Sequence, residues 1–264
     1  MADLKLVNIS SIPAHIYKYI PTSRVLDILE KEPHQIGFVS PELWYDPYEI
    51  KYLNTDYSGL NGYKQPQIFC FCARMDLQNE EASWKIYKKE NDPLLRLIIK
   101  TEDFVSSLLE FAEEKECDIY LSKVDYHFKK AEIDGLYLLS SPYRQEFFQN
   151  FNDEQYVKIM SLKRNAFKYE NEVRFFVIPR NLDNIENNLK NRVLSVPIDI
   201  NMIKRITYYP ADKVDNTLSS QIAFAKYDAE KKMIRERLKN AFPDVNFMKS
   251  VLYQNVKSVT RIEI

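Results

Sequence analysis

Residues 163–178, with the sequence KRNAFKYENEVRFFVI, constrain the fold more than any other stretch of the chain. A charged segment leads directly into an apolar run that is typical of a buried β-strand. If the chain is extended throughout, Glu170, Glu172 and Arg174 project from one face, because side chains alternate along a strand. Buried charges cost free energy unless they are paired or used. We therefore expect a functional site at this position.

The charge of the chain is nearly balanced, with 37 basic and 38 acidic side chains in 264 residues. This balance gives no global reason to expect nucleic acid or an anionic membrane as a partner. Three cysteines do not suggest a disulfide framework, which favours a reducing, intracellular compartment. We find neither a signal-peptide pattern nor an apolar run long enough to span a bilayer. We therefore predict a cytoplasmic protein without a membrane partner.

Several common classes of site lack their sequence signatures. The chain has four glycines and neither a GxGxxG nor a GxxxxGK[ST] motif, which argues against Rossmann and P-loop nucleotide binding. His15, His34 and His127 are scattered and form no HExxH or zinc-type spacing. We therefore expect no metal, and nucleophilic catalysis by a Ser-His or Cys-His pair has little support.

Strand and helix patterns interleave without regular βαβ spacing, which predicts a single α+β domain over residues 1–264. We expect a largely antiparallel or split central sheet flanked by helices. The predicted strands are residues 14–20, 35–39, 67–72, 94–100, 119–126, 172–178, 193–198 and 204–209, with one or two more within 245–264. The predicted helices are residues 22–32, 79–91, 102–115, 141–162 (split near Asn152) and 217–240.

Two segments carry more specific expectations. Residues 50–66 look like an irregular loop, rich in Tyr, Asn and Gly. The longest helix has apolar residues at helical spacing, which predicts that its buried side carries Leu218, Ile222, Ala225, Ala229 and Met233.

Three short motifs occur in order along the chain. The first is a strand, IYKYI, followed by a helix and the turn WYDPYE, which contains Asp46 and Glu49. The second is the strand FCFC, followed by Trp84 and Tyr87 on a helix. The third is Lys163 followed by YENEVR at residues 169–174. Together the motifs resemble the bacterial family catalogued as domain of unknown function 2971 over about residues 15–210, with residues 211–264 outside. Tyr45 departs from the asparagine that is usual in that family.

The layout of that family is similar to that of ADP-ribosyltransferases, including DarT-like toxins. The resemblance implies an enzyme that uses NAD, a nucleotide-type small molecule, as a transferase or an NAD glycohydrolase. It further implies a bacterial toxin or phage-defence effector whose macromolecular target is a protein or a nucleic acid. Glu172 would be the catalytic acid, with Glu170 and Arg174 beside it. The residues that would line the nucleotide pocket are Tyr17, Lys18, Tyr19, Asp46, Glu49, Trp84 and Tyr87.

Each of these residues also has a purely structural interpretation. Arg174 and Lys168 can pair with the two glutamates at a sheet edge. Asp46 can cap the turn that follows it, which is the commoner role of such an aspartate. Aromatic residues at helical spacing, such as Trp84 and Tyr87, more often belong to a core than to a binding site.

Two other functions stay open from the sequence. One is a non-catalytic module in which the aromatic turn and the charged strand bind a protein or an RNA. The other is a metal-dependent nuclease, which would need its acidic residues within metal-ligand distances, namely Asp46, Glu49, Glu170 and Glu172. Convergence of Asp46, Trp84 and Glu172 in one concave pocket would favour an enzyme.

Overall fold

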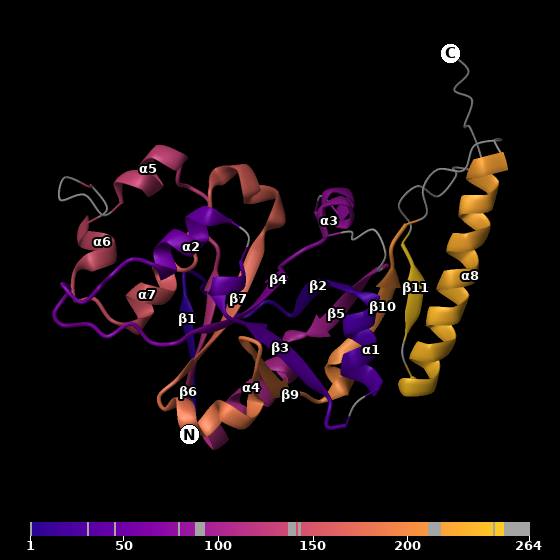
Figure 1. Cartoon of the computed structure of the whole chain (residues 1–264), viewed down its shortest axis with the longest axis horizontal. Coiled ribbons are helices and arrows are strands. Elements are labelled where there is room, and N and C mark those ends of the chain that lie inside the picture. The colour runs from indigo at the N-terminus through magenta and orange to yellow at the C-terminus, as the bar shows by residue number, and fades with distance from the viewer. Residues whose placement is uncertain are drawn as a thin grey trace, which may run out of the picture.

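The computed structural model describes most of the chain. The described residues are 2–30, 32–44, 46–78, 80–87, 93–136, 141, 144–210, 218–244 and 246–250. They form one mixed α+β domain in which helices flank a single mixed sheet (Figure 1), as predicted. Tyr45 and the expected late strands within 251–264 lie outside the described residues.

The helices and strands follow the predicted order. The strands are β1 (Leu4–Val7), β2 (His15–Pro21), β3 (Gln35–Val39), β4 (Phe69–Arg74), β5 (Leu94–Lys100), β6 (Cys117–Lys123), β7 (Glu172–Pro179), β8 (Leu189–Lys190), β9 (Val193–Pro197), β10 (Ile203–Tyr208) and β11 (Phe247–Lys249). The α-helices are α1 (Thr22–Glu30), α2 (Pro47–Leu53), α3 (Glu80–Tyr87), α4 (Thr101–Lys115), α5 (Lys130–Gly135), α6 (Arg144–Phe148), α7 (Asp153–Ile159) and α8 (Leu218–Ala241). A 3₁₀ helix, Asn165–Glu170, precedes β7.

The sheet splits at β4. Its main path runs β1-β6-β7-β4-β2-β5-β10-β11, and β3, β9 and β8 branch from β4. One edge of β4 pairs with β7 along its whole length. The other edge is shared, because β2 pairs only at Tyr17 with Arg74 and β3 only at Val39 with Cys70. Apart from the β1–β6 and β10–β11 pairs, neighbouring strands are antiparallel. The sheet is therefore both largely antiparallel and split.

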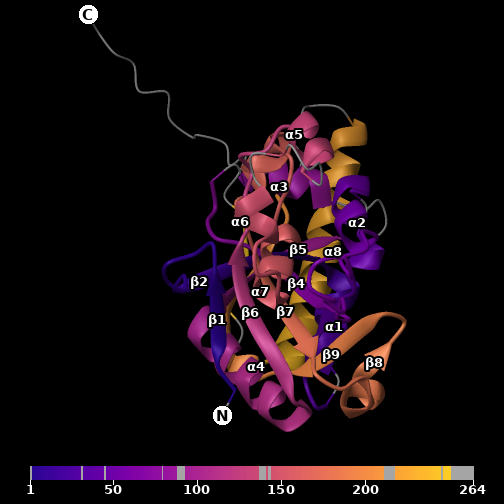
Figure 2. The same cartoon turned by 90° about the vertical axis from the view of Figure 1, so that its left-hand side faces the viewer.

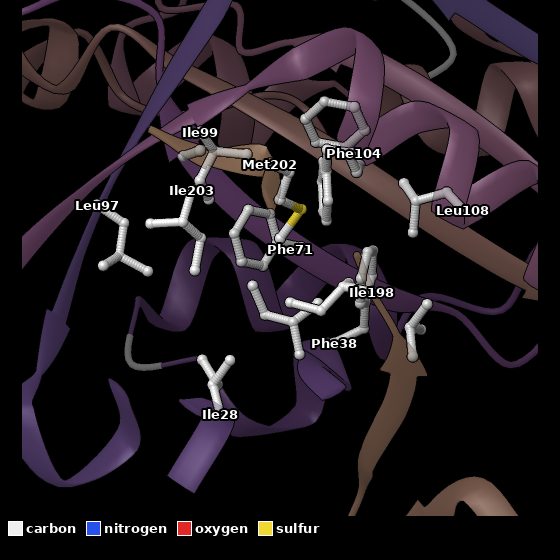
Figure 3. Close-up of a cluster of buried hydrophobic side chains, with 14 of the residues drawn as sticks. Ile28, Phe38, Phe71, Leu97, Ile99, Phe104, Leu108, Ile198, Met202 and Ile203 are labelled. Carbon is white, nitrogen blue, oxygen red and sulfur yellow. The ribbon is translucent and has the colours of Figure 1, made fainter. Parts of the chain in front are cut away.

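Each face of the sheet has its own apolar core. Helices α1 and α4 cover one face, where Phe71 lies 5.6 Å from Phe38 and 5.1 Å from Phe104 between ring centroids (Figure 3). Helices α2, α5, α6 and α7 cover the other face around Tyr52, Tyr156 and other aromatic rings. Helix α7 packs against β6 at the end of the molecule that faces the viewer in Figure 2.

Several short elements differ from the sequence prediction, among them strand β8. Residues 50–66 are not irregular throughout, because α2 extends to Leu53. Asp46 starts this helix by accepting a hydrogen bond from the Tyr48 N–H at 3.0 Å, and proline occupies the first turn. Strand β1 and helix α5 were not predicted. Both are short, and β1 depends on its pairing with β6, which lies more than 100 residues away in sequence.

The predicted buried face of α8 is wrong. Leu218 and Met233 are exposed by 73% and 56%, whereas Ile234 and Leu238 are buried. Helix α8 stands at one end of the molecule beside β11 (Figure 1) and contacts α1. Ile234 and Leu238 of α8 belong to the core and Tyr227 packs partly against it, whereas none of the five residues of the predicted stripe does so. No described helix is long and apolar enough to cross a membrane.

We predict that two adjacent substitutions on α8 will have unequal effects. Ile234→Ala should lower the free energy of unfolding by about 2–4 kcal/mol, because it leaves a cavity in the core. Met233→Ala should change it by less than about 0.5 kcal/mol, because its side chain is exposed. Urea denaturation of both variants checks the orientation of the helix. Equal losses would contradict it.

Candidate active site

The register of the sheet places a row of polar side chains on one face. Residues that lie opposite each other on neighbouring strands project to the same side. From β10 across to β7, the facing pairs bring together Thr207, Arg96, Tyr19, Tyr17, Arg74, Cys72, Glu172 and Arg174. Glu172 and Arg174 therefore share a face, as predicted. Glu170 does not belong to the strand, because the 3₁₀ helix ends there and Asn171 adopts a left-handed conformation with φ of 39°.

Arg174 is the centre of a buried group that we call the charge cluster: Glu49, Lys163, Glu170, Glu172 and Arg174. The side chain of Arg174 is only 1% exposed. Its Nε donates to Glu172 Oε1 at 2.9 Å, and its Nη2 donates to Glu49 on α2. Its Nη1 donates to the Met160 carbonyl at 2.6 Å, and the Trp44 ring centroid lies 4.3 Å from the guanidinium carbon. Each guanidinium nitrogen thus has an acceptor.

Lys163 is the second cation of the cluster. Its Nζ lies 2.5 Å from Glu170 Oε2, 3.2 Å from Glu172 Oε2 and 3.9 Å from Glu49 Oε2. Two cations therefore face three carboxylates, so the cluster has one negative charge when all five groups are ionised. This excess lets one carboxyl group take up a proton without leaving a cation unpaired.

The two neighbouring glutamates have opposite pKa shifts. Burial raises the pKa of Glu170 to about 7, although the Lys163 ammonium opposes the shift. Burial would also raise the pKa of Glu172, but the charges of Arg174 and Lys163 hold that pKa well below its usual range. Carboxyl groups with separated pKa values are the arrangement that acid–base chemistry requires.

Tyr87 on α3 lies beside these carboxylates. Burial, together with the charges of Glu170 and Glu172, raises the pKa of Tyr87 well above its ordinary value. Its ring stacks on Tyr19 at 5.9 Å between centroids, with an interplanar angle of 20°. Trp84 packs edge-on against Tyr19 at 4.8 Å and is buried, and its indole N–H donates to Glu80. Tyr87 thus stacks on Tyr19, on the sheet face that also carries Glu172, whereas Trp84 belongs to the interface between α3 and β2.

Lys18 and Asp46 lie outside the charge cluster. Lys18 projects from the face opposite Tyr17 and Tyr19, donates to the Cys72 carbonyl at 2.6 Å and lies 4.7 Å from the Phe71 ring centroid. It fills the gap where β2 and β4 separate. Asp46 caps α2 and pairs with Arg164 at 3.2 Å. Asp46 therefore has the structural role expected from the sequence, that of a cap, and lies one helical turn away from Glu49.

Sequence reasoning missed several contributors to this site. Lys163 was part of a motif, but it had no assigned role. Tyr126 accepts a hydrogen bond from the Glu172 N–H at 3.1 Å through its hydroxyl oxygen. Trp44 and the Met160 carbonyl contact Arg174. Contacts of this kind join distant segments or use the backbone, so no local pattern in the sequence marks them.

A cavity of about 890 Å³ lies next to the segments that carry Glu170 and Glu172, although no residue of the charge cluster lines it. Its wall includes Tyr169 and Asn171, which precede and follow Glu170 in the chain, and Tyr126, which contacts Glu172. The other lining residues are polar or charged for the most part: Asn8, Arg74, Asp76, Gln78, Lys123, Val124, Asp125, His127, Asn165 and Lys168. A small molecule or a side chain of a partner fits in a space of this size.

The carboxylates of the charge cluster bind cationic side chains of the protein. Within the described residues, no group of three or more His, Cys, Asp or Glu side chains is arranged to hold a metal ion. Lys163 and Arg174 bind the three glutamates of the cluster, and Asp46 pairs with Arg164 instead. The four acidic residues that a metal-dependent nuclease would need are therefore already bound to cations.

Comparison with known proteins identifies no family. No family model matches the chain, and no curated protein matches it. Two solved structures of DarT from Thermus sp. 2.9 do match. The complex with NAD⁺ has 12% identity and a TM-score of 0.32, covering 92% of this chain and 98% of that one. The complex with carba-NAD⁺ has 13% identity and a TM-score of 0.30, covering 91% and 96%. Similarity at this level assigns neither a ligand nor a reaction to this chain.

We predict that Arg174→Met will lower the free energy of unfolding by about 3–5 kcal/mol, because Glu172 and Glu49 remain buried without their partner. Arg180→Met is a matched control, since Arg180 also pairs with a carboxylate but is 67% exposed. Urea denaturation should show little change for the control. Equal stabilities of the two variants would contradict the central role of Arg174.

We also predict a pH-dependent effect of Glu170→Gln. The pKa of Glu170 is about 7 in the folded chain, above the value of about 4.3 expected when unfolded. The folded chain therefore holds this proton more tightly, and the stability that protonation provides is lost as the pH rises from about 4.3 through 7. Between pH 5 and pH 8 the variant should gain roughly 1–3 kcal/mol relative to the wild type.

Urea denaturation at several pH values measures this difference. Glu114→Gln, at an exposed position of α4, serves as the control for the substitution itself. A difference between Glu170→Gln and the wild type that stays constant from pH 5 to pH 8 would contradict the raised pKa.

Proposed function

We propose that this protein is an enzyme that cleaves the bond between nicotinamide and ribose in NAD and transfers the ADP-ribosyl group. The main supporting observation is that all three motifs supply residues to one place. Glu49 comes from the first motif and Glu170 with Glu172 from the third, and the charges of these two glutamates act on Tyr87 of the second. A cavity of about 890 Å³ lies next to the segments that carry these glutamates, which favours an enzyme. The convergence of Asp46, Trp84 and Glu172 in one concave pocket is not observed, because none of the three lines this cavity.

Glu170 is better placed than Glu172 to contact a substrate. Both oxygens of Glu172 are engaged, Oε1 by Arg174 and Oε2 by Lys163. Glu170 accepts a hydrogen bond from Lys163 through Oε2, and its Oε1 has no hydrogen-bond partner within the described part of the chain. The sequence favoured Glu172 as the catalytic residue. We assign that role to Glu170. Glu172 binds Lys163, and Arg174 in turn binds Glu172.

The chemistry of NAD cleavage fits this assignment. The departing nicotinamide takes the electron pair of the bond, and positive charge develops on the ribose. A carboxylate that accepts a hydrogen bond from a ribose hydroxyl stabilises that charge. The pKa of about 7 makes Glu170 increasingly ionised above neutral pH. Tyr87, supported by Tyr19, offers an aromatic ring beside it against which a planar base stacks.

The binding-module alternative has less support. It requires the charged strand to be a recognition surface, yet Glu172 and Arg174 are exposed by only 5% and 1%. The proposal keeps the expectation that the chain acts in the cytoplasm as a toxin or a phage-defence effector, since removing NAD or modifying a cellular target harms a cell. The target is a protein or a nucleic acid, or water if the enzyme is a glycohydrolase.

We predict that the wild type releases nicotinamide from NAD and that Glu170→Gln lowers the rate by about 10²–10⁴-fold. Chromatography of nicotinamide measures the rate, and Glu114→Gln is the exposed control. Circular dichroism confirms that the variants are folded. Absence of NAD binding by calorimetry at millimolar ligand, or full activity of Glu170→Gln, would overturn the proposal.

A further inference from the structure

A second acid–base group lies in the cavity next to the charge cluster. Asp125 Oδ1 accepts a hydrogen bond from the backbone N–H of His127 at 2.9 Å and lies 2.6 Å from His127 Nδ1. Because a carboxylate accepts hydrogen bonds, Nδ1 carries the proton, and Nε2 is left free to accept another. The His127 side chain is 91% exposed. An imidazole held in this way is suited to remove a proton from a bound group.

The segment that carries this pair is fixed to the charge cluster. The Val124 N–H donates to the Glu172 carbonyl at 3.0 Å, and the Lys163 N–H donates to the Asp125 carbonyl at 2.9 Å. The Tyr126 hydroxyl accepts from the Glu172 N–H. Residues on both sides of Glu170 line the same cavity as Asp125 and His127. The histidine and the glutamate thus lie on neighbouring segments that backbone hydrogen bonds join.

Packing does not explain the position of His127. An aspartate that caps a turn needs only the bond to the backbone N–H, which the chain would keep with any residue except proline at position 127. The second contact, from Asp125 to the ring, orients a side chain that is almost wholly in solvent and buries nothing. The other charged or titratable groups that face the cavity are Arg74, Asp76, Lys123, Tyr126, Lys168 and Tyr169.

We propose that this cavity receives the acceptor of the ADP-ribosyl group and that His127, oriented by Asp125, removes the acceptor's proton; the proposal rests on the NAD-cleaving function above. The acceptor oxygen or nitrogen forms a bond to the ribose carbon. The bond from that carbon to nicotinamide breaks, and its electron pair leaves with neutral nicotinamide. The acceptor's proton moves to His127 Nε2. A base is needed only for a hydroxyl or N–H acceptor, so the acceptor is not a carboxylate.

The test uses water as the acceptor and azide as a substitute that has no proton to lose. We expect His127→Gln to lower nicotinamide release in buffer by about 10²-fold or more. Azide should restore release by this variant and yield ADP-ribosyl azide, because an anionic nucleophile needs no base. Azide should not restore Glu170→Gln, whose defect lies in stabilising the ribose cation. Asp125→Asn, which removes the charge that positions the imidazole, should show a smaller loss that azide also relieves.

His15→Gln is the matched control, because His15 is exposed and lies at the start of β2, outside this cavity. It should keep the wild-type rate. If the wild type releases nicotinamide and His127→Gln does so equally fast, or if azide fails to restore the variant, the role of His127 is overturned while the proposed function stands. If the wild type releases no nicotinamide, both are overturned.

Discussion

The buried guanidinium of Arg174 is the interaction on which the site depends. It joins Glu172 of its own strand to the carbonyl of Met160 and to Glu49 of α2, which lies 125 residues away from Arg174 in sequence. Buried ion pairs add little net stability compared with apolar packing, but removing one partner is costly. Arg174 therefore fixes the relative positions of its partners more than it stabilises the fold. Arg174 holds α2 over the sheet through Glu49. This placement also puts Glu49 Oε2 at 3.9 Å from Lys163 Nζ.

Much of the fold was predictable because its signals are local. Apolar runs bounded by turn residues predicted most strands, and alternation placed Glu172 and Arg174 on one face. The buried face of α8 was not predictable, since helical spacing shows that a stripe exists but not what covers it. Ile234 reaches the core and Met233 does not because of where the neighbouring elements lie. The shared edge of β4 is likewise a long-range property.

The sequence motifs marked the segments that contribute to the site, but not the role of each residue. The ordered motifs contain Glu49, Glu170 and Glu172, whose carboxylates all lie within 3.9 Å of the Lys163 ammonium. The relative importance of the two glutamates was not predictable, because it depends on which oxygens are already occupied and on burial. Glu170 also leaves the strand, since Asn171 takes a left-handed conformation that asparagine tolerates better than most residues. No spacing rule could separate it from Glu172.

The unequal count of charges in the cluster has a thermodynamic consequence. Three carboxylates and two cations leave a single negative charge, and the proton on Glu170 removes it. A positively charged ligand that enters beside Glu170 competes with that proton for the same charge. Binding of the ligand therefore expels the proton, and linkage requires that protonation weaken binding in equal measure. The affinity for any cationic ligand at this place rises with pH until Glu170 is fully ionised.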